Sequence, residues 1–195
     1  AAQTTFPNLA NELAKLGIKY FTFWALSTEN LTGRSKEELD NLFELIRFFL
    51  KNKLKEFKKK EIKFKVIGDL IRLPEDLQKE IFKIVEDTKK NKKMTVVFGL
   101  NYGGRDEIIR SISKIKDQIS KISKKNFANY LDTAGIPDPD LIIRTGGEKR
   151  LSGFMLWQSE YSELYFSDLY FPDFTAKELE KAINNYSERR RRFGK

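Results

Sequence analysis

Short apolar runs alternate with longer amphipathic stretches along this chain, and this alternation constrains its fold more than any other feature. The run IKYFTFWALS, which follows Gly17, is apolar at consecutive positions, as expected for a strand buried on both faces of a parallel sheet. Further strands are predicted at residues 63–68, from Met94, at 141–145 and within ELYFSDLYF. The pattern predicts one α/β domain over residues 1–195, with a mostly parallel central sheet flanked by helices.

Capping residues mark where several helices begin. Ser35 and Glu38 form a capping box before a helix that runs to about Phe57, and Thr175 and Glu178 form a second box before the last helix. Other helices are predicted after Pro74, at 105–122, at 126–132 and in TTFPNLANELAKLG, where the chain opens. No strand stands before this opening helix, which suggests that a first strand once preceded it.

The composition limits the chemistry. The 195 residues include no cysteine and no histidine, which excludes disulfides, thiolate or imidazole metal sites, and Ser-His or Cys-His catalysis within this sequence. A bound metal would have oxygen ligands and would be a hard cation such as Mg²⁺. The 37 basic and 28 acidic residues give a net charge of +9. This charge favours an anionic partner, which could be nucleic acid, a membrane surface or a phosphorylated metabolite. No apolar run reaches the length of a membrane span.

The segment RTGGEKRLS follows the fourth predicted strand. Ligands of open α/β sheets bind beyond the carboxyl ends of the strands. Gly146 and Gly147 would let backbone N–H groups approach an anion, and Arg144 and Arg150 could grip phosphate oxygens bidentately. Ser152 could donate a further hydrogen bond and cap a helix whose N-terminus also favours an anion. Together these residues predict a diphosphate cradle. The alternative is an ordinary strand-to-helix turn with two solvated arginines.

The ends of the first and third strands carry weaker signals. Ser27 and Asn30 could hydrogen-bond a ligand and Arg34 could add positive charge, although the pattern alone favours a turn and a helix cap. Asn101 and Arg105 are candidates for supporting residues around the site, whereas the glycines between them are explained by a tight turn.

Two further signals stay ambiguous from the residues alone. Glu163 lies among apolar and aromatic neighbours, where its carboxylate could bind magnesium on a diphosphate or face solvent at a strand edge. The ending ERRRRFGK could form a phosphate-binding arm or a basic tail.

The segments ALSTEN, IGD, LNYGGRDEI, PDPDLIIRTGGEKRLSGFMLWQSEYSELYF, FPDF and RRFGK together resemble the cis-prenyltransferase family. The bacterial type of this family is undecaprenyl diphosphate synthase. The resemblance is collinear and covers essentially the whole chain. It implies a magnesium-dependent enzyme that condenses isopentenyl diphosphate with an allylic diphosphate, forms cis double bonds and releases diphosphate. It also implies an apolar tunnel that accepts the growing chain, and a polyprenyl product such as the undecaprenyl lipid carrier of cell-wall synthesis.

The resemblance assigns roles to individual residues. It implies that Arg144, Arg150 and Ser152 hold the diphosphate of isopentenyl diphosphate and that Glu163 helps to bind Mg²⁺. The remaining assignments are Asn30 with Ser27 near the reacting centre, Arg34 as a substrate-binding cation, and Arg192 and Gly194 as the C-terminal Arg-x-Gly that reaches a diphosphate.

The resemblance also implies partners and a location. We expect a homodimer with ELYFSDLYF at its interface, a cytoplasmic protein with membrane contact during product release, and no nucleic-acid partner. The alternative is a non-catalytic subunit of a heteromeric cis-prenyltransferase. Retention of Arg144, Arg150, Ser152 and Glu163 argues against that alternative, because such a subunit would not need these residues.

The sequence departs from the family pattern in two places. The family's N-terminal motif of the MDGNGRWA type is absent, so the domain is expected to lack its N-terminal strand and aspartate-bearing loop and to be inactive by itself. Leu31 stands where bacterial relatives have tryptophan, and one residue more separates it from Arg34, which affects the match of that arginine and the choice of allylic primer.

Overall fold

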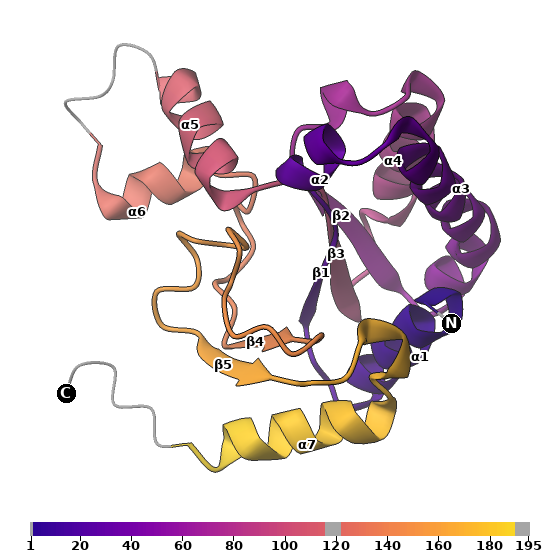
Figure 1. The fold of residues 1–195 in the computed structure, drawn as a ribbon, viewed down its shortest axis with the longest axis vertical. Helices are drawn as coiled ribbons and strands as arrows, with labels where there is room; N and C mark the ends of the chain where they lie inside the picture. Colours follow the sequence, from indigo (N-terminus) through magenta and orange to yellow (C-terminus); the bar gives the residue numbers. More distant parts are fainter. Residues whose placement is uncertain (1, 116–121, 190–195) are drawn as a thin grey trace. The chain divides into compact units, whose positions relative to one another are not determined.

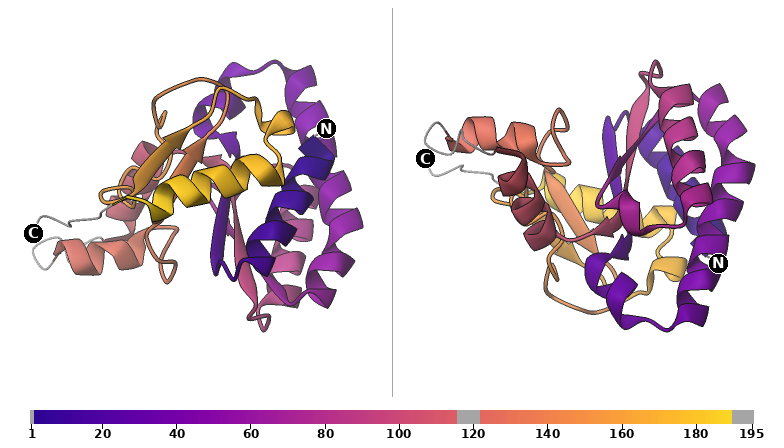
Figure 2. Two further views of the ribbon diagram at one scale, coloured as in Figure 1. Left: turned by 90° about the horizontal axis from the view of Figure 1, so that it is seen from below. Right: turned by 90° about the horizontal axis from the view of Figure 1, so that it is seen from above.

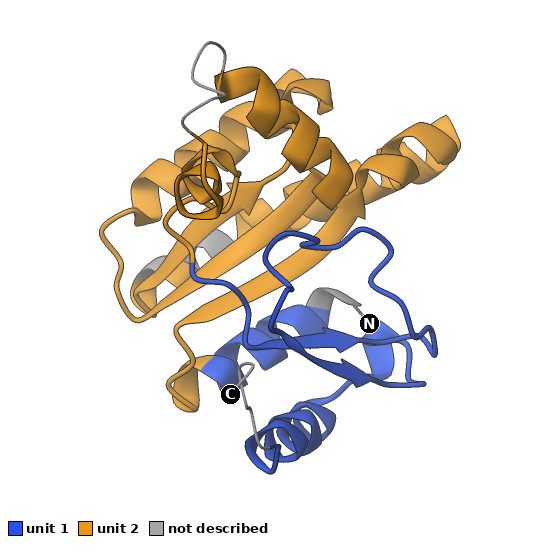
Figure 3. Ribbon diagram, turned by 90° about the vertical axis from the view of Figure 1, so that its left-hand side faces the viewer, with its two compact units in different colours: residues 1–13, 137–195 blue, residues 14–136 orange. Residues whose placement is uncertain are grey.

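The computed structural model describes residues 2–115 and 122–189, which form two compact units. Unit 1 comprises residues 1–13 and 137–195, and unit 2 comprises residues 14–136 (Figure 3). Each unit combines helices with parallel strands (Figure 1), so the predicted α/β class and the parallel strand direction are confirmed. The strands hydrogen-bond in two groups, one in each unit.

Unit 2 is built on a three-stranded parallel sheet in the order β1-β3-β2. Its strands are β1 (Tyr20–Ser27), β2 (Ile62–Ile67) and β3 (Met94–Tyr102). The central strand β3 is buried at every position except Thr95, which explains why its sequence is apolar without alternation. Ser27 at the end of β1 lies opposite Tyr102 at the end of β3, so the carboxyl ends of these strands meet at one edge of the sheet.

The helices of unit 2 follow its strands. They are α2 (Thr28–Gly33), α3 (Lys36–Lys59), α4 (Glu75–Thr88), α5 (Gly104–Ile115) and α6 (Lys124–Phe127), with 3-10 turns η1 (Leu70–Arg72) and η3 (Ala128–Tyr130). Helices α3 and α4 lie side by side and both contact β2 (Figures 1 and 2). The predicted capping box forms at the start of α3, where the Ser35 N–H donates to Glu38 Oε2 at 2.9 Å and the Glu38 N–H donates to Ser35 Oγ at 3.3 Å.

Aromatic side chains form the centre of the unit 2 core. The rings of Phe64 on β2 and Phe98 on β3 stack with centroids 4.7 Å apart. Phe57 on α3 contacts Phe64, and Phe49 on the same helix contacts Phe98. Aromatic rings bury a large apolar area each, so these contacts fix the helix against the sheet.

Unit 1 contains a two-stranded parallel sheet of β4 (Leu141–Arg144) and β5 (Glu163–Phe166). Its other elements are α1 (Ala2–Lys15), which continues into unit 2, η4 (Phe171–Asp173) and α7 (Ala176–Ser187). Helix α7 begins directly after Thr175, as the second predicted capping box indicated, but the Thr175 side chain makes no capping hydrogen bond. Glu178 instead binds Lys181 at 2.7 Å, so only the position of this capping signal was right.

The segment that follows β4 differs from the prediction. A helix beginning at Ser152 was expected, but residues 152–161 form successive turns. Ser152, Gly153 and Met155 have φ angles of 49°, 90° and 47°, which lie outside the right-handed helical region. The helix N-terminus that was expected to bind an anion here is therefore absent from the described structure.

Gly68 occupies a position that no other residue fits. Its φ is 114°, and a Cβ added there would lie 2.0 Å from the carbonyl oxygen of Leu100. We expect Gly68→Ala to lower the free energy of unfolding by about 3 kcal/mol or more in urea denaturation, because both backbone strain and a backbone clash oppose it. Gly135 is the control: its φ is 73° but a Cβ there meets nothing within 4 Å. Gly135→Ala should therefore cost only about 1–2 kcal/mol. Equal losses in the two variants would contradict the role of the clash.

Candidate active site

The end of β1 places Ser27 and Asn30 together. Ser27 is 8% exposed, and its Oγ accepts a hydrogen bond from the Asn30 N–H at 3.1 Å, which caps α2. Asn30 itself is exposed, as is Arg34, whose N–H closes the same short helix on the Asn30 carbonyl at 3.2 Å. The local structure thus matches the turn and helix cap that the pattern favoured. It leaves the side chains of Asn30 and Arg34 accessible to a ligand.

Asn101 connects the ends of β2 and β3. It is 1% exposed and has a φ of 47°, a left-handed conformation that asparagine tolerates better than most residues. Its Nδ2 donates to the Asp69 carbonyl at 2.8 Å, and its own carbonyl accepts the Asp69 N–H at 3.1 Å. Asn101 was predicted to support the site, and within unit 2 it holds the backbone that follows β2.

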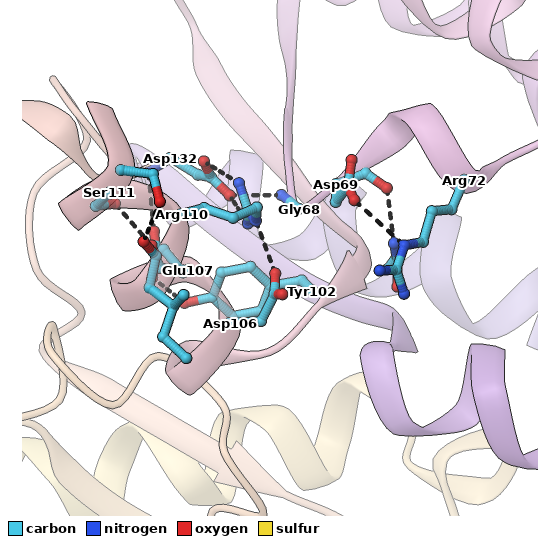
Figure 4. Close-up of polar contacts among 12 residues, drawn as sticks. Gly68, Asp69, Arg72, Tyr102, Asp106, Glu107, Arg110, Ser111 and Asp132 are labelled. Atoms are coloured by element: carbon cyan, nitrogen blue, oxygen red, sulfur yellow. Dashed lines mark hydrogen bonds and ion pairs between the residues drawn. The ribbon is translucent and has the colours of Figure 1, made fainter. Parts of the chain in front are cut away.

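A cluster of charged and polar side chains joins Tyr102 at the end of β3, helix α5 and Asp132 (Figure 4). The fully buried Glu107 accepts hydrogen bonds from the Tyr102 hydroxyl at 2.7 Å and the Asp132 N–H at 2.9 Å. Burial and the negative charge of Glu107 raise the pKa of Tyr102, so its hydroxyl stays protonated and donates.

Asp132 makes several contacts in this cluster. Its carboxylate binds Arg110 through two contacts of 3.0 and 2.6 Å and accepts the Gly68 N–H at 3.0 Å. Arg110 also binds Asp106 at 2.7 Å, one helical turn earlier on α5. Sequence reasoning missed this cluster. The only signal was the charged spacing of Asp106 and Arg110 on a predicted helix, which does not reveal Asp132 as a partner.

In unit 1, the end of β4 brings Arg144 and Ser152 together. Arg144 Nη1 donates to Ser152 Oγ at 3.0 Å. Arg150 instead pairs with Glu148, and both of these side chains are largely exposed. Two of the three residues that were predicted to bind phosphate are thus in contact with each other. Arg150 is near in sequence and bound to another partner.

Gly146 and Gly147, which lie between Arg144 and Arg150, do not act as expected. Their N–H groups were predicted to face an anion, but Gly146 donates to the Leu169 carbonyl at 2.8 Å and Gly147 to the Ser167 carbonyl at 2.9 Å. These bonds attach the loop after β4 to the segment after β5. Both glycines have positive φ angles, 93° and 79°, so they are needed for the turn and not for anion binding.

Glu163 binds a different residue of unit 1. Its Oε2 accepts a hydrogen bond of 2.6 Å from Arg189 Nη1, just beyond α7. Register places Leu141 beside Glu163 and Phe166 beside Arg144. Because successive side chains of a strand alternate between faces, Glu163 and Arg144 lie on opposite faces of the β4-β5 sheet. Within unit 1 the predicted metal ligand is therefore separate from the Arg144–Ser152 pair.

Neighbouring contacts show which face α7 covers. A hydrogen bond with Glu178 raises the pKa of Lys181, and Tyr165 contributes a smaller charge interaction. Tyr165 and Glu163 share a face of β5, the strand lies near α7, and Glu163 contacts Arg189 just beyond that helix. The other predicted residues of this region, Arg192 and Gly194, lie outside the described residues.

Comparison with known proteins decides the family. The family profile described as putative undecaprenyl diphosphate synthase matches residues 1–194. The chain belongs to the undecaprenyl diphosphate synthase family of prenyltransferases. It is 43% identical to the isoprenyl transferase of Chlamydia muridarum over 98% of this chain and 78% of that protein. It is 46% identical to the isoprenyl transferase of Fusobacterium nucleatum over 93% of this chain and 79% of that protein.

Solved structures agree with this assignment. The crystal structure of lavandulyl diphosphate synthase from Lavandula x intermedia in complex with dimethylallyl diphosphate covers 100% of this chain, with a TM-score of 0.94 and 36% identity, over 86% of that chain. A probable undecaprenyl diphosphate synthase from Campylobacter jejuni also covers 100% of this chain, with a TM-score of 0.91 and 36% identity, over 92% of that chain. The resemblance found in the sequence and the predicted prenyltransferase activity are confirmed. In the described part of the chain, no helix is long and apolar enough to cross a bilayer.

The Asp132 contacts predict a pH dependence of stability. Burial alone would raise the pKa of Asp132, but the hydrogen bonds and charge of Arg110 and the Gly68 N–H outweigh it and hold the pKa below its ordinary value. The resulting stabilisation is complete above the unfolded pKa of about 3.9 and is lost as the pH falls through the lower folded value. At pH 7 we expect Asp132→Asn to lower the free energy of unfolding by about 2–3 kcal/mol.

This difference from the wild type should shrink as the pH is lowered below about 4, because the wild-type carboxylate then also becomes neutral. Urea denaturation at a series of pH values measures it. Asp173→Asn, at an exposed position of η4, is the control and should show little effect at any pH. A difference between Asp132→Asn and the wild type that stays constant down to about pH 2 would contradict the contribution of Asp132.

Proposed function

We propose that this protein elongates a cis-prenyl chain by condensing isopentenyl diphosphate with an allylic diphosphate to give a polyprenyl diphosphate. The observation that carries the proposal is the contact between Arg144 and Ser152 at the carboxyl end of β4, inside the most specific family motif. Membership of the family supports the same reaction. Nothing in the comparisons favours the alternative of a non-catalytic subunit.

The Arg144–Ser152 pair has the donor arrangement that a diphosphate requires. Ser152 Oγ accepts from Arg144 Nη1, so the hydroxyl proton remains free to donate to a phosphate oxygen. The guanidinium keeps its other N–H groups in a planar fork that matches two phosphate oxygens. One anion could therefore bind both side chains without breaking their mutual contact.

Arg150 would join this pair by releasing Glu148. Both side chains of that ion pair are largely exposed, with 62% and 47% of their surfaces accessible. Exposed ion pairs contribute at most about 1 kcal/mol, so a doubly charged phosphate group can replace Glu148 at little cost. The proposal assigns the diphosphate of isopentenyl diphosphate to these three residues.

Asn30, capped onto Ser27, and Arg34 are proposed to act at the end of β1, near the reacting carbon atoms and the allylic diphosphate. The reaction leaves an allylic cation when diphosphate departs, so the leaving group must be stabilised by positive charge and water must be excluded. An apolar tunnel for the growing chain is part of this proposal.

The donor chemistry for magnesium is limited but suitable. No three His, Cys, Asp or Glu side chains gather around a possible metal position in residues 2–115 and 122–189. Mg²⁺ often binds through one or two carboxylates together with substrate phosphates, so Glu163 could hold it jointly with a diphosphate. When bound, the cation would neutralise diphosphate charge. Glu163 would have to exchange its contact with Arg189 to bind it.

Assembly and location extend the proposal. Large side chains are exposed around β5, with Tyr161 at 59%, Leu169 at 40% and Tyr170 at 71% accessible. We propose that this surface forms a homodimer interface and that the C-terminal Arg192 and Gly194 reach a diphosphate. A cytoplasmic location with membrane contact at product release fits an enzyme whose product is a lipid.

Incorporation of radiolabelled isopentenyl diphosphate into extractable lipid tests the reaction. The assay uses the protein expressed with its complete natural sequence, Mg²⁺ and farnesyl or geranyl diphosphate. We expect Arg144→Ala to lower kcat/KM for isopentenyl diphosphate about 10²-fold or more, because a charge-assisted donor to the diphosphate is lost. Arg144→Lys should give an intermediate loss, since the charge stays but the planar fork does not.

Lys79→Ala is the matched control, because it removes a positive charge from an exposed ion pair on α4. Its activity should equal that of the wild type. Absence of incorporation by folded wild-type protein would overturn the proposed reaction. Full activity of Arg144→Ala would overturn the role of the Arg144–Ser152 pair.

A further inference from the structure

The side chain of Arg189 has two partners at once. Nη1 donates to Glu163 at 2.6 Å, while Nε and Nη2 both donate to Asn185 Oδ1, at 3.1 and 2.7 Å. Asn185 lies one turn earlier on α7, and the Arg189 N–H is bound to the Tyr186 carbonyl at 3.1 Å. The guanidinium is therefore held on one edge by its own helix and directs its remaining nitrogen at Glu163.

The pair is open to solvent on one side. About a third of each side chain is accessible, 32% for Arg189 and 30% for Glu163, so an ion from solution can reach both groups. A divalent cation held by this carboxylate would place a second positive charge beside Arg189. A free cation and Arg189 therefore compete for Glu163.

We propose that Arg189 acts as the resident counter-cation of Glu163 and gives up this contact only to a divalent cation that arrives with a diphosphate. The inference rests on the proposed function, since it assumes that Glu163 is a metal ligand. Arg189 need not change its position beyond α7. Nη1 exchanges the carboxylate for a phosphate oxygen, while Nε and Nη2 stay on Asn185.

This arrangement couples the two ligands. The diphosphate supplies negative charge that separates the cation from the guanidinium and gives Nη1 a new acceptor. Each ligand thus removes an unfavourable interaction that the other would meet alone. By thermodynamic linkage, diphosphate must raise the affinity for the cation by the same factor as the cation raises the affinity for diphosphate. Glu163 is then kept from binding free cations in the absence of substrate.

Manganese(II) binding to the full-length protein tests this inference, with the free ion measured by electron paramagnetic resonance and no diphosphate present. We expect Arg189→Gln to bind Mn²⁺ about tenfold more tightly than the wild type, because the substitution removes the competing charge beside the carboxylate. The glutamine keeps a hydrogen-bond donor near Glu163. Arg189→Lys keeps the charge and should bind Mn²⁺ with near wild-type affinity. A gain in affinity is not expected from damage to the structure.

Two controls separate the possible outcomes. Lys181→Ala removes another positive charge from α7, where Lys181 pairs with Glu178, and should leave Mn²⁺ affinity unchanged. Glu163→Gln should lose the Mn²⁺ site both as a single substitution and in combination with Arg189→Gln, which identifies Glu163 as the ligand.

The outcomes distinguish this inference from the proposed function. If Glu163→Gln loses the site but Arg189→Gln binds Mn²⁺ like the wild type, the competition is overturned and the metal role of Glu163 stands. If the double variant of Glu163→Gln and Arg189→Gln binds Mn²⁺ as tightly as Arg189→Gln alone, the proposed metal role falls and the competition falls with it. With inorganic diphosphate added, the wild type should gain Mn²⁺ affinity by a larger factor than Arg189→Gln. Equal gains would also overturn the inference.

Discussion

The carboxylate of Asp132 is the interaction on which the edge of the unit 2 sheet depends. It accepts the N–H of Gly68, just after β2, and both terminal nitrogens of Arg110 on α5 donate to it. The backbone N–H of Asp132 donates to Glu107, whose carboxylate also accepts a hydrogen bond from the Tyr102 hydroxyl at the end of β3. Because a buried or largely buried carboxylate without partners is costly, Glu107 and Asp132 need these contacts, which also link the ends of the two strands.

In unit 1, charged groups lie on opposite faces of a small sheet. Arg144 and Ser152 lie on one face of the β4-β5 sheet, while Glu163 lies on the face that contacts the α7 region. The Arg144–Ser152 pair and the Glu163 carboxylate with its own arginine can thus be close in sequence without neutralising each other. Alternation along a strand only four residues long is sufficient to keep them apart. This separation makes Arg189, and not Arg144, the residue that contacts Glu163.

Local signals predicted helices and strands well and contacts poorly. Ser35 and Glu38 form the expected capping box because both partners lie within one turn of the same helix. The turns of residues 152–161 were missed, since their left-handed positions at Ser152 and Met155 have no reliable signal in non-glycine residues. Gly146 and Gly147 were expected to bind an anion, but their N–H groups bind carbonyls in the segment that follows β5.

The sequence by itself determined the α/β class, the parallel strand direction, most helix starts and the family, because these depend on local periodicity, capping and contiguous motifs. It also placed Arg144 and Ser152 in one predicted phosphate site, because one motif contains both within eight positions of each other. Only the tertiary structure decided that Asp132 meets Gly68 across 64 residues and that Arg189 meets Glu163 across 26. Such contacts depend on strand register and on how a helix packs, and the spacing of nearby residues predicts neither.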